Sequence, residues 1–230
     1  MQDNPFEGRL EALLVGPQVN NKRLCEAIRV CAQRPDVIAS LAPNPYQIKD
    51  AVSYLKDSQI GVIGLVAYPL GNLPTELKCL QTEEALKAGA KQIDITMRLE
   101  SLNAADIDKA QQEAASLCEL VINGGAEPGL IANLSLLAQD TRVTAGEIAR
   151  SCNARLITAN GMGVDTSLED IMKLQEHFGG NLKITACGNV TNAEQALNLV
   201  DYGAERIRTP SPFKILTGLE ILKRHGYQKE

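Results

Sequence analysis

The chain has 230 residues, of which 44% are hydrophobic, 22% charged and 3% aromatic, and its formal net charge is −5. This length and composition allow a full hydrophobic core, which excludes a disordered or fibrous protein. No apolar run reaches the roughly 18 residues of a membrane span, and the mildly acidic balance argues against a nucleic-acid partner. The N-terminus shows no signal-peptide pattern, so we expect a cytoplasmic globular protein.

Six cysteines are scattered along the chain. No two of them have C-x-x-C spacing, and the sequence contains only two histidines. Because a structural zinc ion needs four nitrogen or sulfur ligands at short spacings, we expect no metal ion, and no other cofactor. Cysteines in a chain without a secretory signal are most often small buried hydrophobic side chains.

Eight short apolar or β-branched segments predict buried strands. They lack the polar alternation of a strand that is exposed on one face, which favours parallel strands covered on both faces. The predicted strands span residues 11–15, 36–41, 60–67, 92–97, 129–134, 154–158, 182–187 and 205–209.

Helical patterns separate these strands. Apolar residues recur every three or four positions, which predicts helices that bury one face. The pattern is clearest in residues 46–55 and 104–121, and weaker in residues 22–32, 76–88, 145–152 and 213–222.

Two further predicted helices carry signals at their ends. Ser167 is a predicted N-cap, and the apolar stripe after it ends at Gly179. Thr191 and Glu194 have the spacing of a capping box, and the helix that they open ends before Gly203.

Eight alternating strand and helix units predict a (β/α)8 barrel, the TIM barrel, for which about 250 residues are typical. A doubly wound open sheet is the alternative, but that fold usually has a glycine-rich first turn. The first turn here, residues 15–21, has no G-x-G-x-x-G pattern. No linker or low-complexity segment divides the chain, so we expect one domain over residues 1–230.

In such a barrel, reactive groups lie at the carboxyl ends of the strands and in the loops that follow. Glycines follow the predicted sixth and seventh strands, and a Thr-Pro-Ser turn follows the eighth, where loops often offer backbone N–H groups to a phosphate. The side chains predicted at this end are Glu11, Tyr68, Asp94, Thr96, Arg98, Asn133, Thr158, Asn160, Thr185, Cys187, Arg208, Thr209 and Ser211.

Residues 67–97 read AYPLGNLPTELKCLQTEEALKAGAKQIDITM. This segment resembles the deoxyribose-phosphate aldolase family, whose members carry G-F-P-L-G-x-x-P-T-E-x-K and then A-x-x-x-G-A-x-E-I-D-M. The resemblance continues more loosely through residues 154–161, 188–197 and 203–211. It implies a (β/α)8 barrel that reversibly joins acetaldehyde to glyceraldehyde 3-phosphate through a lysine Schiff base.

The resemblance places other residues where the family has its two active-site lysines. The family's Lys-Thr-Ser-Thr-Gly motif aligns with residues 157–161, which puts Ile157 at the position of the Schiff-base lysine. The second lysine aligns with Thr185. An isoleucine cannot form an imine, and the second amine, which lowers the pKa of the first, is also missing.

Three further positions depart from the family pattern. An aspartate after strand one aligns with Glu11, and a glutamate of strand five aligns with Asn133. The Gly-Thr-Ser-Ser phosphate stretch aligns with residues 208–211, where Pro210 lacks the N–H group that a phosphate would need. Arg208 either binds a phosphate through its guanidinium or fills the site.

Asp94 aligns with the family's catalytic acid/base aspartate. The alternative is a structural role, in which it caps a helix or pairs with a cation such as Arg98 and stays ionised. Lys183 shares a strand face with Thr185 and could replace the missing nucleophile. It could equally begin its strand at the solvent-exposed bottom of the barrel, which we favour because charged groups are rarely buried unpaired.

Three functions follow from this resemblance and these departures. We favour a binding or regulatory barrel without imine chemistry, with a small phosphorylated metabolite as its ligand. The alternatives are an aldolase or other aldehyde-lyase, with Asp94, Thr185 and a relocated Lys183 as catalytic residues, and a scaffold partner in an assembly such as a homodimer. The predicted ligand-binding residues are Asn160, Gly161, Gly188, Arg208, Thr209 and Ser211, with Glu11, Tyr68, Arg98, Asn133, Ile157 and Cys187 lining the same pocket.

Overall fold

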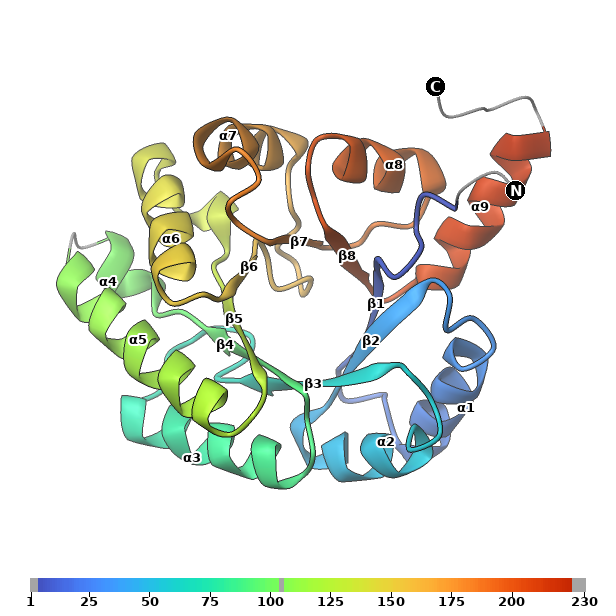
Figure 1. Cartoon of the computed structure of the whole chain (residues 1–230), viewed down its shortest axis with the longest axis horizontal. Coiled ribbons are helices and arrows are strands. Elements are labelled where there is room, and N and C mark those ends of the chain that lie inside the picture. The colour runs from blue at the N-terminus through green and yellow to red at the C-terminus, as the bar shows by residue number, and fades with distance from the viewer. Residues whose placement is uncertain (1–3, 104–105, 225–230) are drawn as a thin grey trace.

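Eight parallel strands close a barrel in sequence order, with each strand hydrogen-bonded to the next and β8 to β1. This closed ring of parallel strands confirms the predicted TIM barrel. The computed structural model describes residues 4–103 and 106–224 (Figure 1). The strands are β1 (Leu10–Leu14), β2 (Ile38–Pro43), β3 (Gly61–Val66), β4 (Gln92–Thr96), β5 (Glu127–Ile131), β6 (Arg155–Ile157), β7 (Ile184–Cys187) and β8 (Arg206–Thr209).

Helices surround the barrel on its outer face (Figure 1). The main helices are α1 (Asn21–Cys31), α2 (Ile48–Tyr54), α3 (Thr75–Lys87), α5 (Ile107–Asn123), α6 (Gln139–Ser151), α7 (Leu168–Phe178), α8 (Ala193–Asp201) and α9 (Pro212–Arg224). The sequence analysis did not predict three short elements, namely α4 (Leu99–Asn103) and the 3-10 turns η1 (Pro45–Gln47) and η2 (Leu134–Leu136). None of the helices in the described part of the chain is long and apolar enough to cross a membrane.

Of the two helix starts predicted from capping signals, one is confirmed and the other is wrong. Ser167 caps α7 as predicted, and Gly179 ends that helix in the left-handed conformation at φ 55°. The capping box predicted at Thr191 is wrong, because Asn192 is the N-cap of α8 and its side chain accepts a hydrogen bond from the amide of Gln195 at 2.8 Å. Residues 104 and 105, where the helix over 104–121 was predicted to start, lie outside the described residues.

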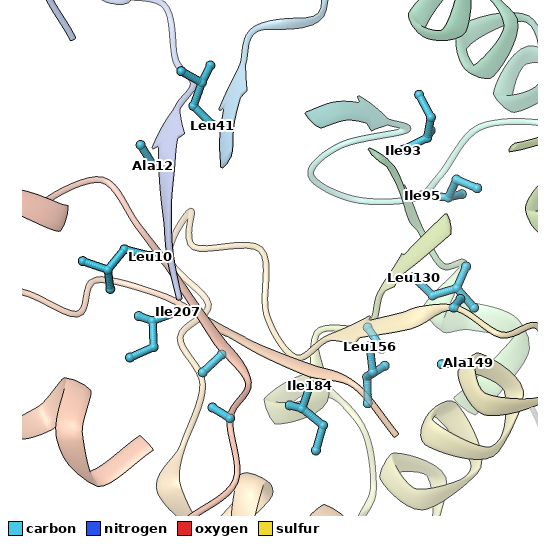
Figure 2. Close-up of a cluster of buried hydrophobic side chains, with 14 of the residues drawn as sticks. Leu10, Ala12, Leu41, Ile93, Ile95, Leu130, Ala149, Leu156, Ile184 and Ile207 are labelled. Carbon is cyan, nitrogen blue, oxygen red and sulfur yellow. The ribbon is translucent and has the colours of Figure 1, made fainter. Parts of the chain in front are cut away.

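The strands present alternate side chains to the helices and to the barrel interior. Figure 2 shows the outward-facing set, which points away from the barrel axis and packs under the helices, as with Ala149 of α6. The strand residues of this set that Figure 2 labels are Leu10, Ala12, Leu41, Ile93, Ile95, Leu130, Leu156, Ile184 and Ile207. The residues between them line the interior, where the candidate site lies.

A second, smaller apolar cluster is formed mainly by inward-facing strand positions. We call it the inner plug, and it consists of Leu13, Ala42, Ile63, Leu65, Ile131, Ile157, Ala159 and Cys187. All six cysteines are free; Cys31, Cys118 and Cys187 are buried as predicted, whereas the other three are partly exposed.

Candidate functional site

Arg208 lies inside the barrel and contacts two carboxylates. Its Nε donates to Glu11 Oε2 at 2.8 Å, and its Nη2 donates to Asp94 Oδ2. Glu11 is the register partner of Arg208 on the neighbouring strand β1, whereas Asp94 comes from β4 on the opposite side of the barrel. The guanidinium is 1% exposed and both carboxylates are wholly buried. The donor groups of Arg208 are thus directed at two carboxylates of the protein itself.

Two more polar side chains close this arrangement into a network. Arg206 Nη1 donates to Glu11 Oε1 at 3.1 Å and to Gln92 Oε1 at 3.3 Å. Gln92 in turn donates through Nε2 to Asp94 Oδ1 at 2.9 Å. The sequence analysis missed both residues. Each lies two positions before a residue that it did identify, so the alternation of a strand would have placed them on the same face.

The environment moves the pKa values of the two carboxyl groups in opposite directions. Burial raises the pKa of Glu11, but the attraction of Arg208, Arg206 and Arg155 outweighs burial and lowers the pKa below its ordinary 4.5. For Asp94, burial dominates, and the charge of Glu11 adds to it, so that its pKa lies above the ordinary 3.8 despite the pull of Arg208. Asp94 is therefore the carboxyl group that holds a proton more readily.

Arg98, which we expected to line the pocket, contacts other residues, and it does not form the pair with Asp94 that a structural role of Asp94 allowed. Its Nη2 donates to the carbonyl of Leu73 at 2.9 Å and to Glu113 Oε1 at 3.1 Å. Arg98 lies two residues after the last residue of β4, and its side chain turns toward α5, which supplies Glu113. The strand alternation that aims Asp94 inward no longer applies after the strand has ended.

The lysines lie away from the carboxylates. Lys183 is exposed and precedes β7, at the end of the barrel opposite the strand carboxyl ends, as we favoured. Lys78 of α3 is the one buried lysine in the described ranges. Its Nζ donates to Glu113 Oε2 at 2.8 Å and to the Thr96 carbonyl at 3.1 Å, and burial lowers its pKa.

Ile157 belongs to the inner plug and is wholly buried. It lies beside Ile131 on β5 and Thr185 on β7. Three buried polar atoms at this end have no hydrogen-bond partner among the described residues, namely the hydroxyls of Thr96 and Thr185 and Oδ1 of Asn133. Leu13 of the plug lies two residues beyond Glu11 on β1, toward the end of that strand.

Tyr68 and Asn160 join opposite sides of the mouth. The Tyr68 hydroxyl donates to the Asn160 carbonyl at 2.5 Å, and Asn160 Nδ2 donates to the Pro69 carbonyl at 3.3 Å. Burial raises the pKa of Tyr68. Burial also raises the pKa of Cys187 to about 12, so this thiol is not a nucleophile at neutral pH.

The predicted phosphate-binding glycines come together, but their N–H groups are already used. A Cβ atom on Gly161 would lie 3.8 Å from the amide nitrogen of Gly188. Both amides donate to backbone carbonyls, at 2.9 and 3.1 Å, and the amide of Ser211 donates to the Thr209 hydroxyl at 3.1 Å. These three donors are satisfied within the protein.

Asp165, which the sequence analysis did not identify, lies against the same loops. Its Oδ1 accepts a hydrogen bond from the Asn189 amide at 2.8 Å, and a Cβ atom on Gly188 would lie 2.8 Å from that oxygen. The Asn189 N–H group, just after the end of β7, therefore already donates to the acidic side chain of Asp165. Within the described ranges, no group of three or more histidine, cysteine or acidic residues could hold a metal ion.

Known proteins with similar sequences share one activity in their names. No protein-family model matches the chain. The chain is 30% identical to the deoxyribose-phosphate aldolase of Thermococcus kodakarensis over 179 residues, which cover 76% of this chain and 80% of that protein. The chain belongs to the deoxyribose-phosphate aldolase family. A second member, from Aciduliprofundum boonei, is 28% identical over 203 residues, which cover 87% of this chain and 89% of the relative.

Solved structures agree with this family membership. QR15, an aldolase, matches with a TM-score of 0.85 and 25% identity, over 96% of this chain and 97% of its own. The deoxyribose phosphate aldolase of Aeropyrum pernix matches with a TM-score of 0.86 over 95% of this chain and 93% of its own, and at 19% identity that match speaks for the fold alone. Within the family's barrel, the present chain has a lumen that is occupied by an ion-pair network and an apolar plug.

Proposed function

We propose that this member of the deoxyribose-phosphate aldolase family carries out no Schiff-base aldol reaction and acts as a binding or regulatory barrel. The observation that carries the proposal is the contact of Arg208 with both Glu11 and Asp94 inside the barrel. The second support is Ile157, a wholly buried side chain at the position where the resemblance places the reactive lysine.

Imine formation needs a neutral amine that can reach a carbonyl carbon. Lys183 is exposed at the far end of the barrel, and Lys78 forms an ion pair with Glu113 on α5. The Lys78 amine reaches the Thr96 carbonyl at the end of β4, but it is held there by its ion pair with Glu113. An aldolase with a relocated lysine is therefore the less favoured function.

The proton transfers of an aldol reaction need an acid/base group that meets the substrate. Asp94 is wholly buried and accepts hydrogen bonds from Arg208 and Gln92. In this arrangement Asp94 stabilises a charge network, and it exchanges no proton with a bound molecule.

A small phosphorylated metabolite is the ligand class that the resemblance implies, near Gly161 and Gly188. A phosphate can use the amides there only if it displaces the internal acceptors, Asp165 among them. Binding would then move the β6–α7 loop that carries Asp165. Such coupling between a ligand and a loop is what a regulatory barrel requires.

Two measurements test this function. Retro-aldol cleavage of deoxyribose 5-phosphate should be absent, with the Thermococcus kodakarensis relative as the active control. Turnover that a single lysine substitution abolishes would overturn the proposal.

Thermal-shift titration with inorganic phosphate or glyceraldehyde 3-phosphate tests the ligand class. Asp165→Asn should bind about fivefold more tightly than the wild type, because one unit charge about 4 Å away costs about 1 kcal/mol in water. Asp140→Asn, an exposed acid on α6, is the matched control and should not differ from the wild type. Equal phosphate affinities of the wild type, Asp165→Asn and Asp140→Asn would contradict phosphate binding beside Asp165.

A further inference from the structure

A pocket of about 350 Å³ lies outside the barrel wall, between α1 and the start of α9. These two helices are neighbours in the outer ring (Figure 1). The wall of the pocket includes Ala12, whose side chain points away from the barrel axis (Figure 2), and Leu14 at the end of β1. The pocket is therefore separate from the charged network inside the barrel.

Helix α1 has one face for the barrel and another for this pocket. Its buried residues, Leu24 among them, pack into the main hydrophobic core. The residues that line the pocket recur three and four positions apart, so they share a second face of the helix. They are Arg23, Glu26, Ala27 and Val30. Val30 is 42% exposed, so this face presents an apolar side chain to the pocket.

The opposite wall comes from the turn after β8 and the first turn of α9. Pro210, Pro212 and Phe213 line it. Phe213 is partly buried and packs against the main core, which fixes one side of its ring and leaves the other for the pocket. A pocket of this size with apolar walls and a few charged groups matches the general form of small-molecule sites, which measure about 300–1,000 Å³.

The two charged groups of the pocket have opposite signs and adjoin each other. Arg23 and Glu26 are both exposed and lie one helical turn apart on α1. Arg23 Nη1 donates to the Gln18 carbonyl at 3.5 Å, the outer limit of a hydrogen bond. Among the residues that the structure describes, neither side chain forms an ion pair. One cation and one anion are thus both available to a ligand at the same pocket.

We propose that this pocket binds a free α-amino acid with an apolar side chain. The carboxylate of the ligand pairs with Arg23 and its ammonium group pairs with Glu26, while its side chain lies between Val30 and Phe213. A zwitterion complements both charges at once. An apolar carboxylate without an amine would bring a second anion to Glu26, and an apolar amine would bring a second cation to Arg23.

The pocket lies behind the strands that hold the central ion pair. Ala12 follows Glu11 on β1 and pairs in register with Thr209, which follows Arg208 on β8. A bound amino acid would therefore pack against the outer side of β1, whose inner side carries Glu11. The inference concerns a pocket outside the barrel and does not rest on the proposed function.

The test is isothermal titration calorimetry of the full chain with leucine at neutral pH. Isocaproate, which lacks the ammonium group, and isoamylamine, which lacks the carboxylate, should each bind about fivefold more weakly than leucine. Glycine should bind at least about tenfold more weakly, because it buries no side chain. No binding of leucine, or equal binding of leucine and isocaproate, would overturn the proposal on the wild-type protein alone.

Four variants locate the site. Arg23→Met and Glu26→Gln should each weaken leucine binding about fivefold. Ala27→Phe, which fills the pocket from the outer face of α1, should abolish it. Arg29→Met removes an exposed charge of α1 outside the pocket and should bind leucine as the wild type does. Leucine binding that is unchanged in Ala27→Phe would overturn the assignment to this pocket.

Discussion

Arg208 and Asp94 meet across the barrel, from strands β8 and β4, which stand four positions apart in the closed sheet. The guanidinium also holds Glu11 on the strand beside it, so one cation neutralises much of the charge of two buried carboxylates. The pair therefore spans the lumen of the barrel.

Removing this cation should be costly. In Arg208→Met, two buried carboxylates lose their shared partner, and the free energy of unfolding in urea should fall by about 3–5 kcal/mol. Arg34→Met is the matched control, because Arg34 pairs with Asp36 at the surface, where such pairs contribute about 0–1 kcal/mol. Equal losses in the two variants would show that the buried network does not stabilise the fold.

The lowered pKa of Glu11 predicts a pH-dependent contribution to stability. At pH 7, Glu11→Gln should lower the free energy of unfolding by about 2 kcal/mol, because charged hydrogen bonds to two arginines are lost. A carboxyl group whose folded pKa lies below its ordinary 4.5 stabilises the protein above that pH, and the stabilisation disappears as the pH falls through the folded pKa.

Urea unfolding between pH 7 and pH 3 therefore should show the gap between wild type and Glu11→Gln narrowing in acid. Asp94, with its raised pKa, gives the opposite slope in the wild type, and Glu11→Gln removes the part of that shift that comes from the charge of Glu11. A gap of constant size over this range would contradict the assignment of an ionised Glu11.

Gly129 has no side chain, and the carboxylate of Asp94 fills the space beside it. A Cβ atom at this position would lie 2.0 Å from Asp94 Oδ1, so Gly129→Ala should cost about 1–3 kcal/mol in unfolding free energy, or more. On β3, Gly61→Ala places its Cβ at 3.5 Å from Ser40, an ordinary contact, and should cost less than Gly129→Ala. Thermal or urea unfolding of the two variants decides this, and a harmless Gly129→Ala would contradict the packing described here.

At the start of α8, the sequence pattern favoured Thr191 as the capping residue, whereas Asn192 is the N-cap in the structure. Asn192→Ala removes the side chain that accepts from the Gln195 amide and should cost about 1 kcal/mol in unfolding free energy. Thr191→Ala, one residue earlier, should cost less than half as much. A larger loss of unfolding free energy in Thr191→Ala than in Asn192→Ala would instead support the capping box that the sequence pattern suggests.

The order of strands and helices was predictable because it depends on local patterns. All eight strands were found, and Ser167 was correctly predicted as an N-cap because its signal lies within one helical turn. Strand ends were predicted less well: the segment predicted as 129–134 forms a strand at Glu127–Ile131, and the chain then turns into η2. Short turns of this kind leave little periodicity in a sequence.

The site was predictable only in part. Glu11, Asp94 and Arg208 were identified from their strand positions, and the resemblance supported Glu11 and Asp94. The role of Arg208, however, depends on contacts with residues 197 and 114 positions away in the chain. Asp165 carries no motif, and only the folded loop brings it to Asn189. Arg98 was misplaced because its direction depends on where β4 ends.

The measurement that tests the central claim most directly is borohydride trapping with acetaldehyde or deoxyribose 5-phosphate, followed by intact mass spectrometry. Reduction converts any lysine imine into a permanent mass increase, and peptide mapping locates it. We expect no substrate-dependent adduct on this chain under conditions in which the Thermococcus kodakarensis relative is labelled. Reproducible labelling of one lysine, Lys183 above all, would contradict the account and show an aldolase with a relocated nucleophile.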